Sequence, residues 1–90
     1  MRIHFSTNGW DDYQHWIESD PTTLARVNAL IRDIRRDPFK GLGKPEPLKQ
    51  DLAGWWSRRI SGEHRLVYRI EGKTVADQRV EIIMCRHHYA

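Results

Sequence analysis

The residues best suited to chemistry in this chain are Glu46, Arg65 and one of the two adjacent histidines His87 and His88. In RNA the 2′-hydroxyl can act as the nucleophile, so cleavage needs a base for its proton, a cation for the phosphate and an acid for the departing 5′-oxygen. A carboxylate, a guanidinium and an imidazole can fill these roles without a metal. Arg stays protonated and its donors match phosphate oxygens, and the imidazole proton is labile near neutral pH. DNA lacks the 2′-hydroxyl, so this set would not act on it.

The backbone of Glu46 is restricted because the residue lies between Pro45 and Pro47 in GKPEPLK. Pro45 fixes its own φ, and a residue that precedes proline is pushed into the extended region. Two interpretations remain open. Glu46 is either part of a stiff surface connector, which is favoured because exposed glutamates are common, or a carboxylate held at a defined place beside a basic sheet.

Two helices are expected in the first half of the chain. The first has apolar residues at helical spacing and a polar residue that can cap it: Trp10, Tyr13 and Ile17, with Thr7 or Asn8 as the cap. The second begins with Asp20 as cap and Pro21 in the first turn, and it ends at Pro38. Its apolar stripe predicts packing against a core, and the two helices should form a hairpin.

Strands are expected at Arg2–Ser6 and at four places after a Gly- and Pro-rich loop: Leu48–Asp51, Trp55–Ile60, His64–Ile70 and Val80–His88. Turn residues separate the last four strands. A strand, two helices and a run of strands predict a single α+β domain over residues 1–90. The economical architecture is a helix hairpin packed on one face of a largely antiparallel sheet, with the other face open.

Alternation along the expected strands indicates which side chains share a face. Leu66, Tyr68 and Ile70 should face the helices, which places Arg65 on the open face. The last strand does not reveal whether His87 or His88 faces that side. As neighbours on a strand they would point in opposite directions, so the two could not chelate one metal together. Because no ligand spacing supports a metal site, we predict none.

Composition narrows the class of protein. The net charge is +3, and the basic residues are concentrated after Asp37, where ten Lys and Arg accompany six acids. This distribution permits nucleic-acid binding without requiring it. Cys85 is the single cysteine, so no intrachain disulfide can form, and the chain has no apolar run that approaches a membrane span. A cytoplasmic protein that does not associate with membranes is expected.

Several blocks of sequence resemble the YoeB toxins, which belong to the RelE-like group of bacterial toxin–antitoxin systems. The most specific are GKPEPLKQDLAGWWSRRISGEHRLVYRI and CRHHY, and the similarity extends to GWDDYQHW and LIRDIRRDPFKGLGKPEPLK. The resemblance therefore covers nearly the whole chain. It implies a microbial RNase fold and ribosome-dependent cleavage of messenger RNA. It also implies neutralisation by a cognate YefM-like antitoxin, whose disordered segment wraps the toxin.

The resemblance assigns roles to individual residues. It implies that Glu46 is the general base, Arg65 the phosphate-stabilising arginine and His88 the general acid, with Tyr89 beside it. Three further basic residues are expected to contact RNA: Lys49 and Arg59, which match basic positions of the family, and Arg58, which lies beside the loop.

Two features depart from the family pattern. The segment EGKTVADQRVEI is longer than expected, so the last hairpin should protrude or pair differently, and Ala90 places the terminal carboxylate one residue beyond Tyr89. Two alternatives to an endoribonuclease remain open. One is a ribosome-binding inhibitor that does not cut, and the other is a degenerate toxin that acts as a co-repressor with its antitoxin. The sequence does not decide whether the chain forms a homodimer.

Overall fold

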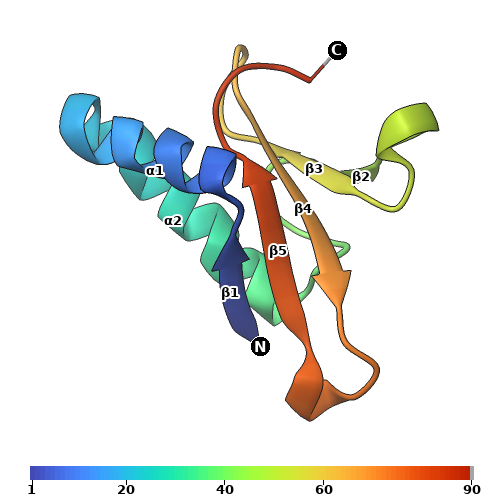
Figure 1. Ribbon diagram of the computed structural model, residues 1–90. Coiled ribbons are helices and arrows are strands. Elements are labelled where there is room, and N and C mark those ends of the chain that lie inside the picture. The colour runs from blue at the N-terminus through green and yellow to red at the C-terminus, as the bar shows by residue number, and fades with distance from the viewer. Residues whose placement is uncertain (90) are drawn as a thin grey trace.

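Two helices pack on one face of a five-stranded sheet in the computed structural model, which describes residues 1–89 (Figure 1). The elements follow in the order β1 (Arg2–Phe5), α1 (Thr7–Ser19), α2 (Pro21–Arg36), β2 (Glu46–Pro47), β3 (Trp56–Arg59), β4 (Arg65–Glu71) and β5 (Arg79–Met84). The strand order is β1-β5-β4-β3-β2. Only the β1–β5 pair among these strands is parallel, so the expected α+β architecture with a largely antiparallel sheet is confirmed.

The helix boundaries follow from local capping. Asp20 accepts a hydrogen bond from the Thr23 N–H (3.1 Å), and Pro21 occupies the first turn of α2, as predicted. For α1 the predicted cap was wrong. Ser6, rather than Thr7 or Asn8, accepts from the Gly9 N–H at 3.0 Å. The cap at Ser6 fixes where α1 begins, and the cap at Asp20 fixes where the chain turns from α1 into α2.

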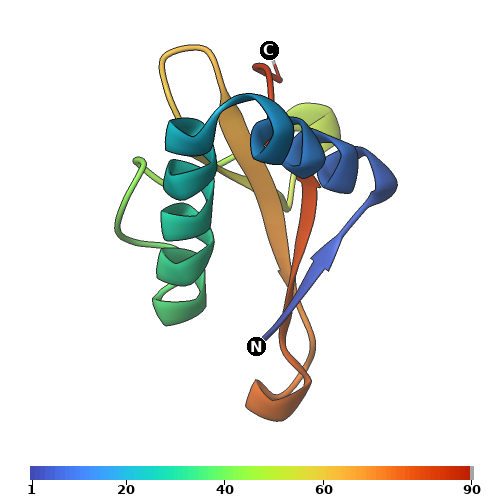
Figure 2. The same cartoon turned by 90° about the vertical axis from the view of Figure 1, so that its left-hand side faces the viewer.

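The helices cover one face of the sheet (Figures 1 and 2), and the core lies between the two layers. Its fully buried members include residues from α2, β4 and β5: Val27, Leu30, Ile34, Leu66, Tyr68, Val80 and Ile82. α1 lies directly against β5 at Gly9, where an added Cβ would be 2.5 Å from the Ile82 carbonyl oxygen. The close contact explains why a residue without a side chain stands at this position.

The strand expected at Leu48–Asp51 is wrong. Extended backbone lies earlier, at Glu46–Pro47, and Gln50–Leu52 forms a 3₁₀ turn in which Gln50 has φ +55°. The two prolines favour the extended conformation at Glu46 and Pro47, whereas a left-handed residue at 50 ends any strand. Glu46, whose backbone was expected to be restricted, therefore forms part of the second strand, β2.

The strand predicted over Val80–His88 ends at Met84. Beyond it the chain leaves the ladder because Cys85 bonds to α1. Its N–H donates to the Asp12 carboxylate (3.0 Å), and its carbonyl accepts from the Trp16 indole (2.8 Å). We call residues 85–89 the C-terminal tail. His87 and His88 thus lie in an irregular segment, and the strand alternation expected for them does not apply.

The β4–β5 hairpin protrudes from the rest of the sheet, as expected from its length (Figure 1). Its strands pair as far as Glu71 and Arg79, and a 3₁₀ turn at Val75–Asp77 closes the loop. Gly72 has φ +106°, and a Cβ there would approach the Asp77 carbonyl oxygen to 2.5 Å. The second departure from the family pattern, at Ala90, lies outside the described residues.

Candidate functional site

The open face of the sheet carries a row of residues contributed by four strands. Glu46 pairs with Ser57, Ser57 with Val67, and Val67 with Met84. Arg59 and Arg65 form the next pair of β3 and β4 on this same face, beyond the intervening pair of Arg58 and Leu66. Directly paired residues share a face, and Leu66 and Tyr68 face the helices, so these side chains lie on the opposite side. The register thus places Glu46 and Arg65 on the open face.

The Glu46 carboxylate is joined to the C-terminal tail. Its Oε1 atom accepts a hydrogen bond from the Tyr89 hydroxyl at 3.1 Å, although the two residues are 43 positions apart. The same hydroxyl lies 3.3 Å from Ser57 Oγ. Ser57 was not identified from the sequence, because only the strand register shows that it faces Glu46. Tyr89 therefore spans from the tail to the β2–β3 edge of the sheet.

His88 lies beside Tyr89, with ring centroids 4.7 Å apart and planes inclined by 33°. The His87 ring is associated with His64 instead, at a centroid distance of 6.0 Å. The two histidines therefore have different surroundings. Of the pair, His88 is the one that packs against the tyrosine bonded to Glu46.

Arg65 lies at the start of β4 and is only 9% exposed. Its Nη1 atom donates to the carbonyls of Ser61 (2.7 Å) and His64 (3.1 Å), which compensate the burial of its charge. Its backbone N–H donates to the His87 carbonyl at 3.0 Å. Arg65 is thus connected to the tail next to His88, while Glu46 is connected to the tail at Tyr89. The structure thus connects Glu46 and the Arg65 backbone to the tail that carries His88.

The prediction that Arg58 contacts RNA is wrong, because Arg58 is fully buried. It pairs with Leu66 on β4, which places it on the helix face of the sheet. There its Nη1 meets Asp33 Oδ2 at 2.5 Å, and its Nε donates to the Tyr68 hydroxyl at 3.2 Å. Three backbone carbonyls of the loop after α2, those of Asp37, Lys40 and Leu42, complete its partners.

The Asp33 carboxylate is correspondingly stabilised in its charged form. The Leu42 N–H donates to it at 2.8 Å, and Arg58 and Arg36 both bond to it. These hydrogen bonds lower the pKa of Asp33 to about 2. We call Arg58, Asp33 and Tyr68, with the loop carbonyls they contact, the loop latch. It fixes the loop that leads from α2 into Glu46.

The other two predicted RNA contacts lie at the surface. Arg59 is exposed on β3 beside Arg65. Lys49 lines a hollow of about 390 Å³ together with the 3₁₀ turn and Tyr89. This hollow adjoins the tail at the residue that binds Glu46. Its lining holds one cation, Lys49, and one carboxylate, Asp51.

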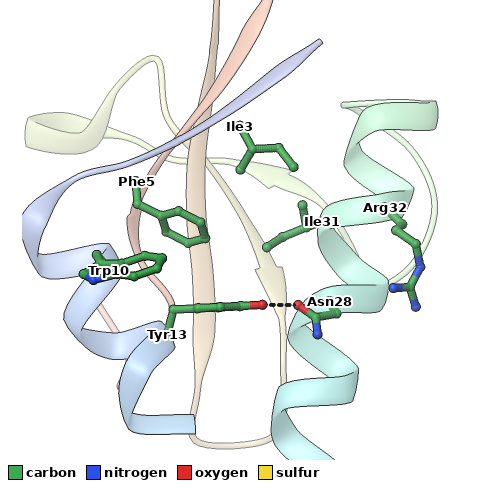
Figure 3. Close-up of a pocket in the computed structure, with 7 residues that line it drawn as sticks. All are labelled: Ile3, Phe5, Trp10, Tyr13, Asn28, Ile31 and Arg32. Atoms are coloured by element: carbon green, nitrogen blue, oxygen red, sulfur yellow. Dashed lines mark hydrogen bonds between the residues drawn. The ribbon is translucent and has the colours of Figure 1, made fainter. Parts of the chain in front are cut away.

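A second hollow, of about 500 Å³, lies on the helix side of the sheet between β1, α1 and α2 (Figure 3). The rings of Phe5, Trp10 and Tyr13 form one wall, and the Tyr13 hydroxyl donates to Asn28 at 2.8 Å. Arg32 extends away from these rings. This hollow has no carboxylate or imidazole in its lining and lies on the other face from Glu46, so it is not the candidate catalytic site.

Among residues 1–89, no three His, Cys, Asp or Glu side chains are placed to hold a metal ion. Cys85 in particular is buried, and its sulfur lies 3.7 Å from the Gly9 carbonyl oxygen. Burial raises the pKa of its thiol to about 12, and Asp12 contributes to the shift. The thiol is therefore neutral and unreactive in the native protein.

This environment leads to a prediction for Cys85. A thiol reagent at pH 8 is expected to leave the native protein unmodified over a time in which it fully labels the protein unfolded in guanidinium. Mass spectrometry of both samples provides the measurement. Rapid stoichiometric labelling of the native protein would show that the thiol is accessible and ionised.

Comparisons with known proteins find similarity over almost the whole chain. A family model described as the YoeB-like toxin of bacterial type II toxin–antitoxin systems matches residues 5–89. The toxin YoeB of Streptomyces coelicolor is 56% identical over 89 residues, covering 99% of this chain and 100% of the relative. A solved YoeB/ParE toxin from Agrobacterium tumefaciens is 52% identical, with a TM-score of 0.94 and coverage of 99% and 100%.

Two solved structures from Staphylococcus aureus are also similar. One is a YoeB dimer, 38% identical with a TM-score of 0.87, and the other is a heterotetrameric YoeB–YefM toxin–antitoxin complex, 37% identical with a TM-score of 0.86. Each of the two alignments covers 99% of this chain and 98% of the Staphylococcus aureus chain. The expected RelE-like fold is thereby confirmed. Sequence and structure together show that the chain belongs to the YoeB family of toxins from type II toxin–antitoxin systems.

Proposed function

We propose that this YoeB-family toxin is an endoribonuclease that cleaves messenger RNA on the ribosome and so inhibits translation. The observation that supports it most is the hydrogen bond between Tyr89 and Glu46. This bond brings the C-terminal tail, with His88, to the carboxylate, while the Arg65 backbone holds the same tail at His87. Glu46 and Arg65, the proposed base and cation, share one face of the sheet, and the tail that carries His88, the proposed acid, is bonded to both residues.

In the proposed reaction Glu46 accepts the proton of the 2′-hydroxyl as the 2′-oxygen attacks the adjacent phosphorus. Arg65 stabilises the negative charge that develops on the non-bridging phosphate oxygens. The bond to the 5′-oxygen breaks, and His88 donates its proton to that oxygen. Tyr89 orients the Glu46 carboxylate. The products are a 2′,3′-cyclic phosphate and a 5′-hydroxyl, and no metal takes part.

The ribosome is proposed to supply the ordered substrate. Lys49 and Arg59 are surface cations beside the site and can hold phosphates without reading the sequence. A few such contacts on an open sheet face do not immobilise a flexible single strand. Messenger RNA held in the decoding site is already ordered, which removes much of the entropic barrier to the reacting geometry.

The partners follow from the relatives. A YoeB protein of Staphylococcus aureus forms a complex with YefM, and we infer that a YefM-like antitoxin neutralises this chain. A dimeric relative supports a homodimer. No helix among residues 1–89 is long and apolar enough to cross a membrane. Because the proposed substrate is ribosome-bound messenger RNA, the toxin is proposed to act in the cytoplasm.

Cleavage through the 2′-hydroxyl can be tested on ribosomes programmed with two messages of the same sequence. In one message the nucleotide on the 5′ side of the cut carries a 2′-deoxyribose. The unmodified message is expected to be cut, with a 2′,3′-cyclic phosphate at the new end, and the deoxy message to remain intact at that position. Equal cutting of both messages would contradict the mechanism.

The same assay distinguishes the alternatives. Arrest of translation with both messages intact would favour a ribosome-binding inhibitor that does not cut. Neither cutting nor arrest, with retained antitoxin binding, would favour a co-repressor.

A further inference from the structure

The backbone of His87 is held on both sides by two consecutive residues, His64 just before β4 and Arg65 at its start. Its N–H donates to the Nδ1 atom of the His64 ring at 2.8 Å. Its carbonyl accepts from the Arg65 N–H at 3.0 Å. The acceptor for the His87 N–H is thus the His64 ring nitrogen, in place of the backbone carbonyl that a neighbouring strand would provide. These two bonds are made immediately before the residues that reach Glu46.

The conformation of His87 explains why such support is needed. Its φ is +66°, in the left-handed region that residues with a Cβ rarely adopt. This conformation changes the direction of the tail after it has left β5, so that Tyr89 reaches Glu46 and Ser57. A residue in this region persists where surrounding contacts determine it. Loss of one of the two bonds should therefore release the tail.

The surroundings of His64 keep its ring in one place. The ring packs edge-to-face against Trp16 at a centroid distance of 4.8 Å, and Trp16 also binds the tail at the Cys85 carbonyl. Because Nδ1 accepts a hydrogen bond, the proton of the neutral ring is on Nε2, which lies 4.0 Å from the Glu63 carboxylate. An imidazolium could not accept this bond.

We propose that His64 is a positioning residue, whose Nδ1 atom holds the His87 peptide so that Tyr89 bonds to Glu46 and His88 lies beside Tyr89. Its effect on cleavage rests on the proposed function, whereas its effect on the tail does not. Four charged or titratable groups surround its ring: Glu63 beside it, His87 and Arg86 from the tail, and His15 from α1.

The electrostatic environment favours the neutral ring. Burial lowers the pKa of His64 below its usual 6.5, and His87, Arg86 and His15 lower it further, against the opposing effect of Glu63. The unfolded chain therefore binds the proton first as the pH falls. The anchoring is fully present above about pH 6.5 and weakens as the pH drops toward the lower pKa of the folded state.

The test compares two replacements. His64→Leu keeps the approximate volume but removes the acceptor, while His64→Asn offers an amide oxygen near the place of Nδ1. His15→Leu is the matched control, since His15 packs against the same Trp16 ring at 4.8 Å and makes no bond to the tail. For each variant the melting temperature, amide hydrogen exchange at His87, and kcat and KM for ribosome-bound message are measured.

His64→Leu is expected to lose the exchange protection of the His87 amide and to lower kcat about tenfold to a hundredfold, with KM little changed. His64→Asn should recover most of both quantities, and His15→Leu should retain them. In the wild type the protection should be constant above about pH 6.5 and fall below it, after correction for the intrinsic exchange rate. In His64→Asn this pH dependence should be absent.

Unchanged protection at His87 in folded His64→Leu overturns the proposal, whatever happens to activity. A loss of kcat that His64→Asn does not reverse overturns it as well. If the wild type does not cut any message but the exchange results are as expected, the anchoring is supported and the ribonuclease proposal fails.

Discussion

The Glu46→Gln variant is expected to associate with ribosomes as the wild type does and to cleave messenger RNA about 10²–10⁴-fold more slowly. The glutamine oxygen can still accept the hydrogen bond that Tyr89 donates to Oε1. The tail, with His88, should therefore stay in place. An amide is not a base, however, so the 2′-hydroxyl keeps its proton and the attack is slowed.

Single-turnover cleavage with toxin in excess over programmed ribosomes measures this loss, and cosedimentation measures binding. Glu63→Gln is the matched control. This substitution removes one negative charge, as Glu46→Gln does, but from an exposed turn. In the wild type the Glu63 carboxylate lies 4.0 Å from the ring of His64, the next residue in the chain. Cleavage by Glu63→Gln should stay within a few-fold of the wild type at pH 7.5. If Glu46→Gln also cuts at nearly the wild-type rate, Glu46 is not the base.

Local signals in the sequence predicted the elements that carry the site. The cap at Asp20 and the proline after it set the start of α2, and alternation placed Leu66 and Tyr68 under the helices. The two prolines around Glu46 restricted its backbone, and the structure shows this restriction as the edge strand β2. These features depend on neighbouring residues, which is why they could be predicted without knowing the fold.

The C-terminal tail could not be predicted in this way. Alternation from Val80 onward continues past Met84, but bonds to Asp12, Trp16 and His64 end the strand there. All three partners are distant in sequence. The roles of Ser57 and His64 are invisible for the same reason, because each depends on a partner across the fold rather than on a nearby residue.

The prediction for Arg58 failed for a different reason. Its position beside the loop suggested a cation at the surface, whereas the side chain is buried. Alternation on β3 places it with Trp56 on the helix face and separates it from Ser57 and Arg59. A buried guanidinium is tolerated only where carboxylate and carbonyl acceptors surround it. Those acceptors come from α2 and from the loop that follows it, up to 25 positions away.

The loop latch therefore leads to the second large expected effect, on stability. Arg58→Met should lower the free energy of unfolding by about 3–5 kcal/mol, because it leaves the Asp33 carboxylate and three loop carbonyls without their buried donor. The same acceptors hold the loop that ends at Glu46, so the variant should also cut more slowly at temperatures where it remains folded.

Urea unfolding at pH 7 measures the loss, with Arg59→Met as control. Arg59 is the next residue on β3, its side chain is exposed, and the chemical change is identical. It should alter stability by no more than about 0.5 kcal/mol, because its side chain lies in solvent. Asp33→Asn should also weaken the latch. The wild type is expected to lose stability as the pH falls from 3.8 toward 2, because the Asp33 carboxylate becomes protonated there. The Asn variant lacks this carboxylate and should not show that loss. Equal stability of the Arg58 and Arg59 variants would show that the buried pair does not hold the loop, and the position of Glu46 would then depend on the β2–β3 pairing alone.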